Sequence, residues 1–585
     1  MSIICRVHAF LCGVEKRWIA KKPVDASDVE ALQSEINLSL ISARLLVRLG
    51  VKTREEALLF FKPTAEHLHD PFLMKDMDVA VNRLIEAIHG RQKIMVYGDY
   101  DVDGTTAVSL MMGFLQELSA DCFPYIPDRY EEGYGFSFKG VEEAAAQGVS
   151  LIITLDCGIK DGKKIDRANE LGMDVIVCDH HQPEELPKAF AVLNPKRSDC
   201  PYPYKGLSGC GVGFKFICAV CDQLSIPLET CFQWLDLVTI AIGADIVPLT
   251  GENRILAYLG LQQMATQRRP GIAALLKSAG HEEKPVGITE AVFLLAPRIN
   301  AAGRIFSGRR AVELLMTTTT DDAEIVAAAI EENNKTRKEL DKSITLEAIA
   351  RIHNDPDSSG RFGMVVADPN WHKGVVGIVA ARLVETFYKP AIVLVEKDGI
   401  LSGSARSIDG VDLYDVLQTC EQYLLQFGGH TMAAGLSMEK EKLDEFREAF
   451  SREIGSRLHG EQPIPSILYD EELPIHAIKP SLFHVIQQME PFGPENMRPV
   501  FLAKRVISGA NTKKIGADRT HLRIHLMDDQ NRSVTMEGVA FHQAHWYETL
   551  VSGDPVDVLY SLDENHWNGR TTLQLQVKDI RRHEA

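Results

Sequence analysis

The stretch VYGDYDVDG, residues 96–104, places three carboxylates close together. Asp99, Asp101 and Asp103 alternate along it, directly after an apolar run. Carboxylates at this density repel one another and cannot all ionise without a compensating cation. The spacing therefore indicates a divalent metal site. An EF-hand calcium loop is the alternative, but it needs flanking helices and a glutamate at its twelfth position, whereas here a strand-like run precedes the carboxylates.

Three further apolar runs end in potential metal ligands. LIITL precedes Asp156, VIVC precedes Asp179, His180 and His181, and LVTIAIGA precedes Asp245. Alone, each aspartate could be a turn or N-cap residue, and the histidine pair could be a polar loop. Helix-like stretches separate the runs, which predicts a parallel, doubly wound sheet. Ligands bind beyond the carboxyl ends of such strands, so we expect all four clusters at that one edge.

The predicted ligand set favours manganese or magnesium. Oxygen donors with one or two imidazoles suit Mn²⁺ or Mg²⁺, whereas zinc prefers fewer ligands and often sulfur. The candidate ligands outnumber what one ion needs, and two ions about 3.5–4 Å apart, bridged by a shared carboxylate, fit better. Such a pair lowers the pKa of a bound water and stabilises the attacking and leaving oxygens in phosphoryl transfer. The residues alone favour a two-metal phosphoesterase.

Length and composition limit the class of protein. The 585 residues exceed one hydrophobic core, so we expect several domains. With 45% hydrophobic and 25% charged residues, no apolar run of about 18–20 residues and no signal peptide, we expect a soluble cytoplasmic protein. The eleven cysteines follow no regular spacing, which indicates reduced thiols. The Cys218–Cys221 pair favours core packing over zinc because it lies in a helix-like stretch.

The net charge of −18 argues against a polyanionic partner when it is taken alone. It does not exclude one, because a carboxylate cluster that holds divalent metal reverses the local sign of the charge.

The motifs occur in the order found in one enzyme family. DYDVDG, LDCGI, CDHH and GADIVPLTGENR resemble the four signature motifs of the DHH phosphoesterases, in the form of its single-strand-specific DNA exonucleases. Further similar stretches follow: LSGCGVGFKF, PRINAAGR, WHKGVVGIVAARL, SGSARS, GGHTMAAG and PFGPENMRPVF. The resemblance covers roughly residues 70–585. Met497 departs from it, since proline is expected there.

The residue patterns and, from residue 71 onward, the resemblance predict an α/β protein of five parts. These are an N-terminal helical region (1–70), a doubly wound parallel-sheet DHH domain (71–290), a connecting helical segment (291–355), a smaller α/β DHH-associated domain (356–460) and a C-terminal OB-type β-barrel (466–585). Two patterns agree with it. Residues 321–353 lack Gly and Pro and predict one long helix or two joined ones. HLRIHLMD and TTLQLQVKDI alternate apolar and polar residues, as strands do.

The resemblance also implies roles for the acidic clusters. The expected metal ligands are Asp99, Asp101, Asp103, Asp156, His180 and Asp245, and the expected catalytic residues are Asp101, Asp156, His180 and His181. Asp179 is expected to orient an imidazole rather than to bind metal.

Substrate contacts are expected in the DHH-associated domain. The residues that match the family's binding site for the terminal nucleotide and its phosphates are His372, Ser404, Arg406, Gly429 and His430. Glycines before a helix present N–H groups to an anion, and Arg406 would supply a charged fork. The active site would then be a cleft between metals and phosphate donors. Arg298 and Arg304 are further candidates for phosphate contacts, with a helix-capping ion pair as the alternative.

Residues 501–535 carry seven Lys/Arg against three Asp/Glu in an acidic chain. The candidates for a single-strand groove are Lys504, Arg505, Lys513, Lys514, Arg519 and Arg523. The alternative is an ordinary solvated face of a barrel, and we favour the groove.

Our first interpretation is a metal-dependent exonuclease that uses two Mn²⁺ or Mg²⁺ ions. It would release 5′-mononucleotides from the 5′ end of single-stranded DNA during repair and recombination; polarity and the preference for DNA come from the resemblance. A DHH phosphodiesterase acting on short oligoribonucleotides or cyclic dinucleotides is disfavoured by the predicted barrel. A non-catalytic single-strand-binding scaffold is disfavoured by the complete ligand set. A single-stranded-DNA-binding protein and a helicase are partners by family analogy only.

Overall fold

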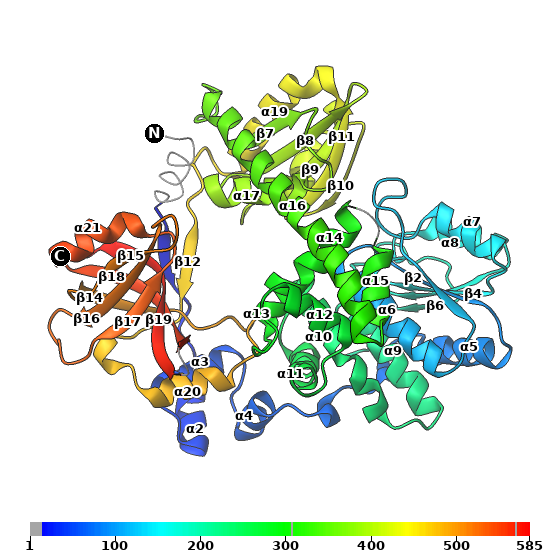
Figure 1. Ribbon diagram of the computed structural model, residues 1–585, viewed down its shortest axis with the longest axis horizontal. Helices are drawn as coiled ribbons and strands as arrows, with labels where there is room; N and C mark the ends of the chain where they lie inside the picture. Colours follow the sequence, from blue (N-terminus) through cyan, green and yellow to red (C-terminus); the bar gives the residue numbers. More distant parts are fainter. Residues whose placement is uncertain (1–14, 306–307, 568–569, 585) are drawn as a thin grey trace. The chain divides into compact units, whose positions relative to one another are not determined.

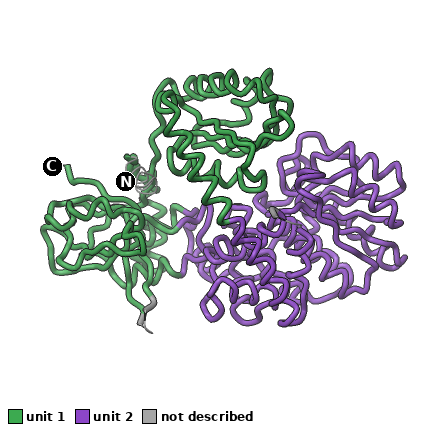
Figure 2. Tube along the Cα trace, turned by 45° about the horizontal axis from the view of Figure 1, so that its top comes forward, with its two compact units in different colours: residues 1–48, 338–487, 498–585 green, residues 49–337, 488–497 purple. Residues whose placement is uncertain are grey.

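The structure is a computed structural model that describes residues 15–305, 308–567 and 570–584 (Figure 1). The chain folds into two compact units (Figure 2). Leu49–Arg337 and Gln488–Met497 form one unit, which we call the catalytic unit. The second unit contains the described residues up to Arg48, Lys338–Gln487 and those from Arg498 onward. Within these described ranges, no helix combines the length and the apolar character that a membrane span requires.

The catalytic unit is built on a five-stranded parallel sheet. Its strands are β2 (Ile94–Gly98), β3 (Cys122–Tyr125), β4 (Leu151–Leu155), β5 (Asp174–Cys178) and β6 (Ala191–Leu193). Their order is β3-β2-β4-β5-β6, and every pair is parallel. This is the order of a doubly wound sheet, in which the direction of winding reverses between two central strands, here β2 and β4. The predicted parallel, doubly wound sheet is confirmed.

Helices cover both faces of this sheet (Figure 1). On one face lie α5 (Met77–His89), α6 (Val102–Glu117) and α9 (Gly209–Gln223). On the other lie α7 (Phe138–Ala146) and α8 (Gly162–Glu170). The central strands are therefore buried on both sides, which explains why each reads as an unbroken apolar run. Helices α6 and α9 are themselves buried on almost every side, so they too are apolar around most of their circumference.

The apolar run before Asp245 differs from the sequence prediction, which placed it with the strands. It forms a helix, α10 (Leu235–Ala244), and Asp245 is its C-cap residue. Residues Leu235–Gly243 are all buried, so the run is apolar on every side. Periodicity cannot separate such a helix from a buried strand.

The remaining elements of the catalytic unit are helical. They are α4 (Arg54–Phe61), η1 (Ala65–His67), η2 (Pro71–Leu73), η3 (Leu228–Trp234), α11 (Gly251–Thr266), α12 (Pro270–Ser278), α13 (Ile288–Glu290), η4 (Ala291–Leu295), α14 (Ala296–Ile305) and α15 (Arg309–Met316). The helix predicted over 321–353 is one continuous helix, α16 (Thr320–Asn354), and it continues from the catalytic unit into the second unit.

The second unit contains a smaller sheet with the order β10-β11-β9-β8-β7. Its strands are β7 (Met364–Asp368), β8 (Ala391–Lys397), β9 (Ile400–Arg406), β10 (Gln426–His430) and β11 (Ala433–Glu439). The helices of this region are α17 (Val376–Phe387), α18 (Leu413–Thr419), α19 (Leu443–Arg457), η5 (Glu421–Tyr423) and η6 (Lys440–Lys442). β7 and β8 are parallel and the other neighbours antiparallel, so the region is the small α/β fold that was predicted.

The C-terminal region is a β-structure that closes on itself. Its strands are β13 (Glu471–Glu472), β14 (Phe501–Ser508), β15 (Lys513–Ile515), β16 (His521–Asp528), β17 (Met536–Ala540), β18 (Val556–Trp567) and β19 (Arg570–Arg582). β14 pairs with both β18 and β16, so β14, β18, β19, β17 and β16 form a ring. The predicted alternation holds, because Leu522, Ile524 and Leu526 are fully buried while their neighbours are not. Short helices accompany the ring: η7 (Ile475–Ala477), α20 (Pro480–Gln488), η8 (Ala544–Trp546) and α21 (Tyr547–Ser552).

The start of the chain is divided between the two units. β1 (Arg17–Ala20), α2 (Ala26–Ile36) and α3 (Leu40–Arg48) belong to the second unit, whereas α4 belongs to the catalytic unit. β1 pairs in parallel with β12 (Ser466–Tyr469), the strand that precedes the ring. Residues 1–14 lie outside the described residues.

Candidate metal centre

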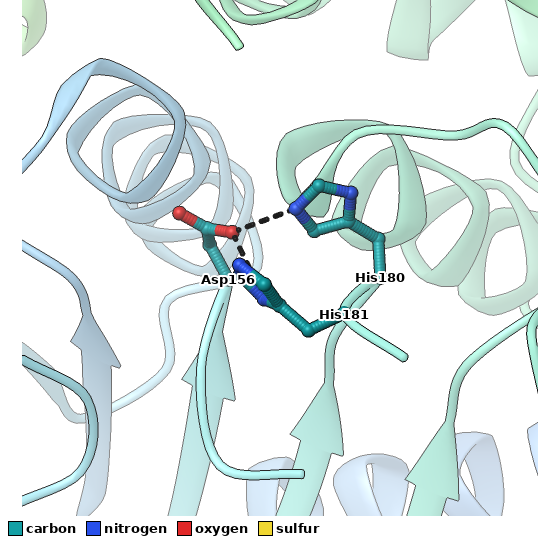
Figure 3. Close-up of side chains that lie close together, drawn as sticks. All are labelled: Asp156, His180 and His181. Atoms are coloured by element: carbon teal, nitrogen blue, oxygen red, sulfur yellow. Dashed lines mark ion pairs between the residues drawn. The ribbon is translucent and has the colours of Figure 1, made fainter. Parts of the chain in front are cut away.

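The predicted ligands lie at the carboxyl edge of the parallel sheet, close to one another. Asp99 follows β2, Asp156 follows β4, and the histidine pair follows β5. These three strands are direct neighbours, so their ends bring the side chains together. Figure 3 shows Asp156 beside His180 and His181. Asp156 has a φ of +59°, in the left-handed region that aspartate tolerates better than most residues. The sheet thus gathers residues that are far apart in sequence.

The carboxylates converge on His180. Its Nε2 lies 3.2 Å from Oδ1 of Asp156, 3.5 Å from Oδ2 of Asp245 and 3.8 Å from Oδ2 of Asp103. None of these contacts is a hydrogen bond: Nε2 of His180 and Oδ1 of Asp156 are buried and have no hydrogen-bond partner among the described residues. Asp245 reaches this point although it follows a helix.

Asp179 fixes the loop that carries the histidines. Its Oδ1 accepts hydrogen bonds from the backbone N–H of His180 at 2.7 Å and of His181 at 3.0 Å, and from Nδ1 of His181 at 2.7 Å. Its Oδ2 accepts from the backbone N–H of Ile159 at 3.0 Å. Burial alone would raise the pKa of Asp179, but the hydrogen bonds and the charge of His181 lower it to about 2. An ionised Asp179 sets the orientation of the His181 ring.

Asp103 is held by the N-terminus of α9. Its Oδ2 accepts a hydrogen bond from the N–H of Gly209 at 2.6 Å, and its Oδ1 accepts one from Cys210 at 2.8 Å. Free N–H groups and the helix dipole both favour a carboxylate there. A Cβ on residue 209 would lie 2.5 Å from Cβ of Asp156, so this close approach requires glycine. The LSGCG stretch therefore positions two candidate ligands, a role that the sequence did not reveal.

Asp99 and Asp101 flank the start of α6. Asp101 is the N-cap residue, and its side chain accepts a hydrogen bond from the N–H of Gly104 at 3.1 Å. Asp99 is fully buried; Oδ1 accepts from the N–H of Gly135 at 3.4 Å, whereas Oδ2 has no partner in the described part of the chain. A Cβ on Gly104 would lie 2.4 Å from the carbonyl oxygen of Asp99, so the turn between strand and helix also requires glycine.

Burial is the main cause of the unusual protonation of this cluster, and neighbouring carboxylates add to it. Burial and Asp101 raise the pKa of Asp103 to about 7, and burial and Asp103 raise that of Asp245 to about 9. The same two causes raise the pKa values of Asp99 and Asp156 well above their ordinary range. The carboxylates therefore resist ionisation together unless a cation compensates them.

The imidazoles respond to their surroundings in opposite ways. Burial, followed by the charge of His181, lowers the pKa of His180 to about 3. Burial would also lower the pKa of His181, but the hydrogen bond to Asp179 and its charge outweigh burial and raise it. At neutral pH His180 is thus a neutral imidazole, the form that binds metal.

The donor set fits a hard divalent cation. Two groups of three donors each lie within 4.8 Å and share His180: one adds Asp156 and His181, and the other Asp103 and Asp245. Buried atoms of Asp99, Asp156 and His180 without hydrogen-bond partners are the lone pairs that a cation would satisfy. All these donors are oxygen or imidazole nitrogen, which favours Mn²⁺ or Mg²⁺ over zinc.

Two residues near the centre were not found by sequence reasoning. The hydroxyl of Tyr134 lies 3.0 Å from Nε2 of His181. Lys196 is half-buried, and its positive charge acts on Asp245 and lowers the pKa of His180. Neither residue directly follows an apolar run, so the pattern of ligands at strand ends does not predict them.

The second unit brings together part of the candidate phosphate site. Nη1 of Arg406 donates to Oγ of Ser404 at 3.0 Å, and both side chains lie beside Gly377 in the first turn of α17. A Cβ on Gly377 would lie 3.2 Å from each of them, so glycine leaves this helix terminus open. Arginine, hydroxyl and helix N–H groups are typical anion donors.

The other candidates of this site lie nearby in the fold. His372 is in the loop before α17, where its Nδ1 accepts from the N–H of Gly374 at 3.1 Å. Gly429 and His430 are in the edge strand β10 rather than in a loop, and Gly429 pairs with Ala434. Ser404 donates to the carbonyl of that same Ala434 at 3.4 Å.

Arg298 has the geometry of the ion-pair alternative. Its side chain is buried, its Nε lies 2.6 Å from Oε2 of Glu331, and its Nη1 donates to the carbonyl of Leu294 at 2.9 Å. The side chain of Arg304 lies outside the described residues.

The basic residues of the C-terminal ring fall into two groups. Three have carboxylate partners: Lys504 with Glu472 at 2.6 Å, Arg505 with Asp529 at 2.9 Å and Arg523 with Glu537 at 2.7 Å. The other three form no ion pair with the described residues: Lys513, Lys514 and Arg519. Nζ of Lys514 lies 4.8 Å from the centre of the Tyr547 ring.

Three families match successive parts of the chain. Residues 93–242 match the DHH family, N-terminal domain, residues 359–456 match the DHHA1 domain, and residues 469–579 match the RecJ OB domain. The first match runs from β2 into α10 and ends three residues before Asp245.

Two curated relatives resemble nearly the whole chain. The single-stranded-DNA-specific exonuclease RecJ of Bacillus subtilis is 38% identical over 96% of this chain and 70% of its own length. The RecJ of Dickeya dadantii is 33% identical over 93% of this chain and 96% of its own length.

Solved structures agree with these relatives. The crystal structure of RecJ in complex with Mn²⁺ from Thermus thermophilus matches with a TM-score of 0.82 at 26% identity, over 97% of this chain and 80% of that one. The structure of exonuclease RecJ bound to manganese matches with a TM-score of 0.58 at 31% identity, over 67% of this chain and 96% of that one. Both of these structures contain manganese, one of the two metals that the donor set of this chain favours.

Proposed function

The chain belongs to the RecJ family of single-stranded-DNA-specific exonucleases, and from this premise we propose the direction, products and residues of its reaction. It is a metal-dependent exonuclease of single-stranded DNA. We propose that it degrades the strand from the 5′ end to 5′-mononucleotides and serves DNA repair and recombination. The observation that carries the assignment to this site is the cluster around His180, where three carboxylates surround a buried, neutral imidazole.

In our proposal the cluster holds two Mn²⁺ or Mg²⁺ ions. The ligands would be Asp99, Asp101, Asp103, Asp156, His180 and Asp245. When bound, such ions activate a water and neutralise the charge that develops during phosphoryl transfer. The chain's own part is to hold these side chains in place: α9 fixes Asp103, and Asp179 fixes the histidine loop. His181, which contacts both Asp179 and Tyr134, would hold or release a proton during the reaction.

We further propose that the second unit binds substrate phosphates. Arg406, Ser404 and the N-terminus of α17 form one set of donors, with His372, Gly429 and His430 as additional contacts. The basic side chains of the C-terminal ring would bind a further part of the strand. A cytoplasmic location, and cooperation with a single-stranded-DNA-binding protein and a helicase, rest on family analogy alone.

The test is a digestion of single-stranded DNA that carries a label at either end. With Mn²⁺, a 5′-labelled strand should release labelled mononucleotide from the first moments, whereas a 3′-labelled strand should shorten through a ladder. Without divalent metal neither strand should change. Early mononucleotide from the 3′-labelled strand would reverse the polarity. Binding without cleavage, or cleavage confined to short RNA or cyclic dinucleotides, would support one of the alternative functions.

A further inference from the structure

Three consecutive buried residues of the GADIVPLTGENR motif have no place in the ligand set. They are Glu252, Asn253 and Arg254, in the first turn of α11. Oε1 of Glu252 lies 3.1 Å from Nζ of Lys215, and Oε2 accepts from the hydroxyl of Tyr202 at 2.6 Å. Each of the three residues anchors a different segment, and the segments held by Asn253 lead to the metal centre.

Asn253 joins two loops. Its side chain is fully buried, and its Nδ2 donates to the carbonyl of Gly206 at 2.6 Å and to the carbonyl of Pro248 at 2.9 Å. An amide nitrogen has two N–H groups, so both are used within the protein. One loop precedes α9 and the other follows α10.

The first loop leads directly to a candidate ligand. Gly206 lies three residues before Gly209, whose N–H donates to Asp103 at 2.6 Å. Gly209 also packs against Asp156, because its missing Cβ would lie 2.5 Å from Cβ of that residue. A shift of the loop at Gly206 would therefore move the start of α9, and with it the support of Asp103.

The second loop leads to another candidate ligand. Pro248 lies three residues after Asp245, and the intervening Ile246 has a φ of +57° and a side chain that is 70% exposed. A β-branched residue is rarely left-handed, and residues 245–249 belong to no helix or strand. Hydrogen bonds fix this turn to the core: Asn253 and the hydroxyl of Tyr204 donate to the carbonyl of Pro248 at 2.9 Å and 3.1 Å, and the N–H of Leu249 donates to the carbonyl of Pro494 at 2.8 Å.

Packing around Asn253 leaves little freedom for the two loops. A Cβ on Gly206 would lie 2.8 Å from the hydroxyl of Tyr204, and one on Gly251 would lie 2.7 Å from the ring of the same tyrosine. The tyrosine thus fills the space between the loops and Asn253 ties their backbones together. Only small movements would be needed to misplace Asp103 and Asp245, because both approach the same atom, Nε2 of His180.

We propose that Asn253 is a positioning residue of the metal centre, which sets the spacing of Asp103 and Asp245 by holding the Gly206 and Pro248 loops together. The inference rests on the proposed function, because it assumes that these two aspartates bind the metal. Outer residues that orient metal ligands commonly contribute 10- to 100-fold to metal affinity.

The test compares direct Mn²⁺ binding by the metal-free parent protein and by variants, using isothermal titration calorimetry. Asn253→Asp keeps the shape of the side chain but replaces two donors with acceptors. Asn253→Ala removes both bonds, and Asn253→Ser keeps one donor in a smaller side chain. We expect Mn²⁺ to bind about 10-fold more weakly to Asn253→Ala. In the nuclease assay the Mn²⁺ requirement should rise by a similar factor, with the rate largely restored at saturating Mn²⁺.

Asn496 supplies a matched control within the same unit. It is also buried, and its Nδ2 also donates to two carbonyls, those of Met489 at 3.0 Å and Pro491 at 2.9 Å. Asn496→Ala should lower the melting temperature about as much as Asn253→Ala. Its segment contacts the second loop, where the N–H of Leu249 donates to the carbonyl of Pro494 at 2.8 Å, so we expect a loss of Mn²⁺ affinity that is clearly smaller than that of Asn253→Ala.

Three results decide the matter. Parent-like Mn²⁺ affinity in any folded Asn253 variant that has lost both bonds overturns the proposal, and so does an equal loss of affinity in Asn496→Ala. If Asn253→Asp and Asn253→Ala do not fold, Asn253→Ser must still bind Mn²⁺ measurably more weakly than the parent. Failure of the proposed function is separate, because the parent protein itself would then neither bind Mn²⁺ nor degrade the labelled strand.

Discussion

The metal centre and the basic face of the C-terminal ring treat charge in opposite ways. At the centre, several carboxylates are buried close to one another. Buried oxygen atoms of Asp99 and Asp156 have no hydrogen-bond partner in the described residues. On the ring, Lys504, Arg505 and Arg523 lie at the surface and are each neutralised by a neighbouring carboxylate. Charges that are costly to bury indicate a bound ion. Exposed pairs contribute little to stability and release their partners easily. The metal centre is therefore specific for a cation. The basic side chains of the ring, in contrast, can bind any anion that displaces the neighbouring carboxylates.

We expect the largest loss of activity from a substitution at Asp156. Asp156→Asn keeps the shape and tolerates the left-handed backbone, for which alanine would be a poorer substitute. We expect hydrolysis to fall by about 10³-fold, because an electrostatic contact to the reacting group is lost. The metal-free protein should become more stable, since a buried carboxylate that resists ionisation is removed. Single-turnover assays and thermal melts in EDTA measure the two effects; near-normal hydrolysis by the purified variant would remove Asp156 from the ligand set.

A truncation tests whether the ring and the centre can be separated. Gln488–Met497 belongs to the catalytic unit, where the buried Arg254 donates to the carbonyls of Met489, Glu490 and Pro491. A chain that ends at residue 465 leaves this guanidinium without those partners, whereas one that ends at Met497 keeps them. We expect the longer truncation to be more stable, by about 3 kcal/mol.

Denaturant unfolding of both truncated proteins measures this difference. The longer one should still cut very short oligonucleotides with Mn²⁺, because the ligand set lies within residues 99–245. Equal stability of the two proteins would show that the contacts of Arg254 with this segment contribute nothing measurable.

The raised pKa values predict how pH affects the metal-free protein. Asp103 and Asp245 titrate near 7 and 9 in the folded protein and near 3.8 when unfolded, so the folded state holds more protons between these values. Linkage then requires the free energy of unfolding to decrease as pH rises from 6.5 to 8.5. His181, whose pKa is also raised, acts in the same direction. The lowered pKa of His180 changes the pH dependence of stability only below about pH 6.5, where the unfolded state binds a proton that the folded state does not.

Thermal melts with EDTA at both pH values check this, and saturating Mn²⁺ should make the dependence much weaker because the cation holds the carboxylates ionised. Asp245→Asn is the matched variant, with a flatter dependence in EDTA. Stability that rises with pH in the metal-free parent would contradict the assignment.

The smallest effects are expected on the ring. Lys513 and Lys514 have no carboxylate partner among the described residues, so their replacement by alanine should remove contacts with the strand. Each lost contact should lower the slope of log affinity against log salt by about 0.7. Lys504→Ala is the control, because Glu472 already neutralises that lysine and a smaller change should follow. Fluorescence anisotropy with a long oligonucleotide at several salt concentrations distinguishes them. Equal changes in all three variants would mean that the ion pair with Glu472 opens when DNA binds.

The sequence by itself determined the sheet and the composition of the centre. Apolar runs that end in Asp99, Asp156 and His180 predicted neighbouring parallel strands, because a strand buried on both faces must be apolar throughout. The alternation in 521–528 predicted a strand with one buried face, and the lack of Gly and Pro in 321–353 predicted the long helix. These patterns are local, and local periodicity records which faces of a segment are buried.

Tertiary structure decided what depends on several segments at once. The run before Asp245 is a helix, which no period could reveal because all its sides are buried. The partner of Arg298 is Glu331, thirty-three residues away, and the partners of Asp103 are the backbone N–H groups of Gly209 and Cys210. A backbone N–H has no sequence signature, since every residue except proline carries one. Backbone carbonyls likewise have no sequence signature, so the sequence does not reveal that Asn253 joins two separate loops through them.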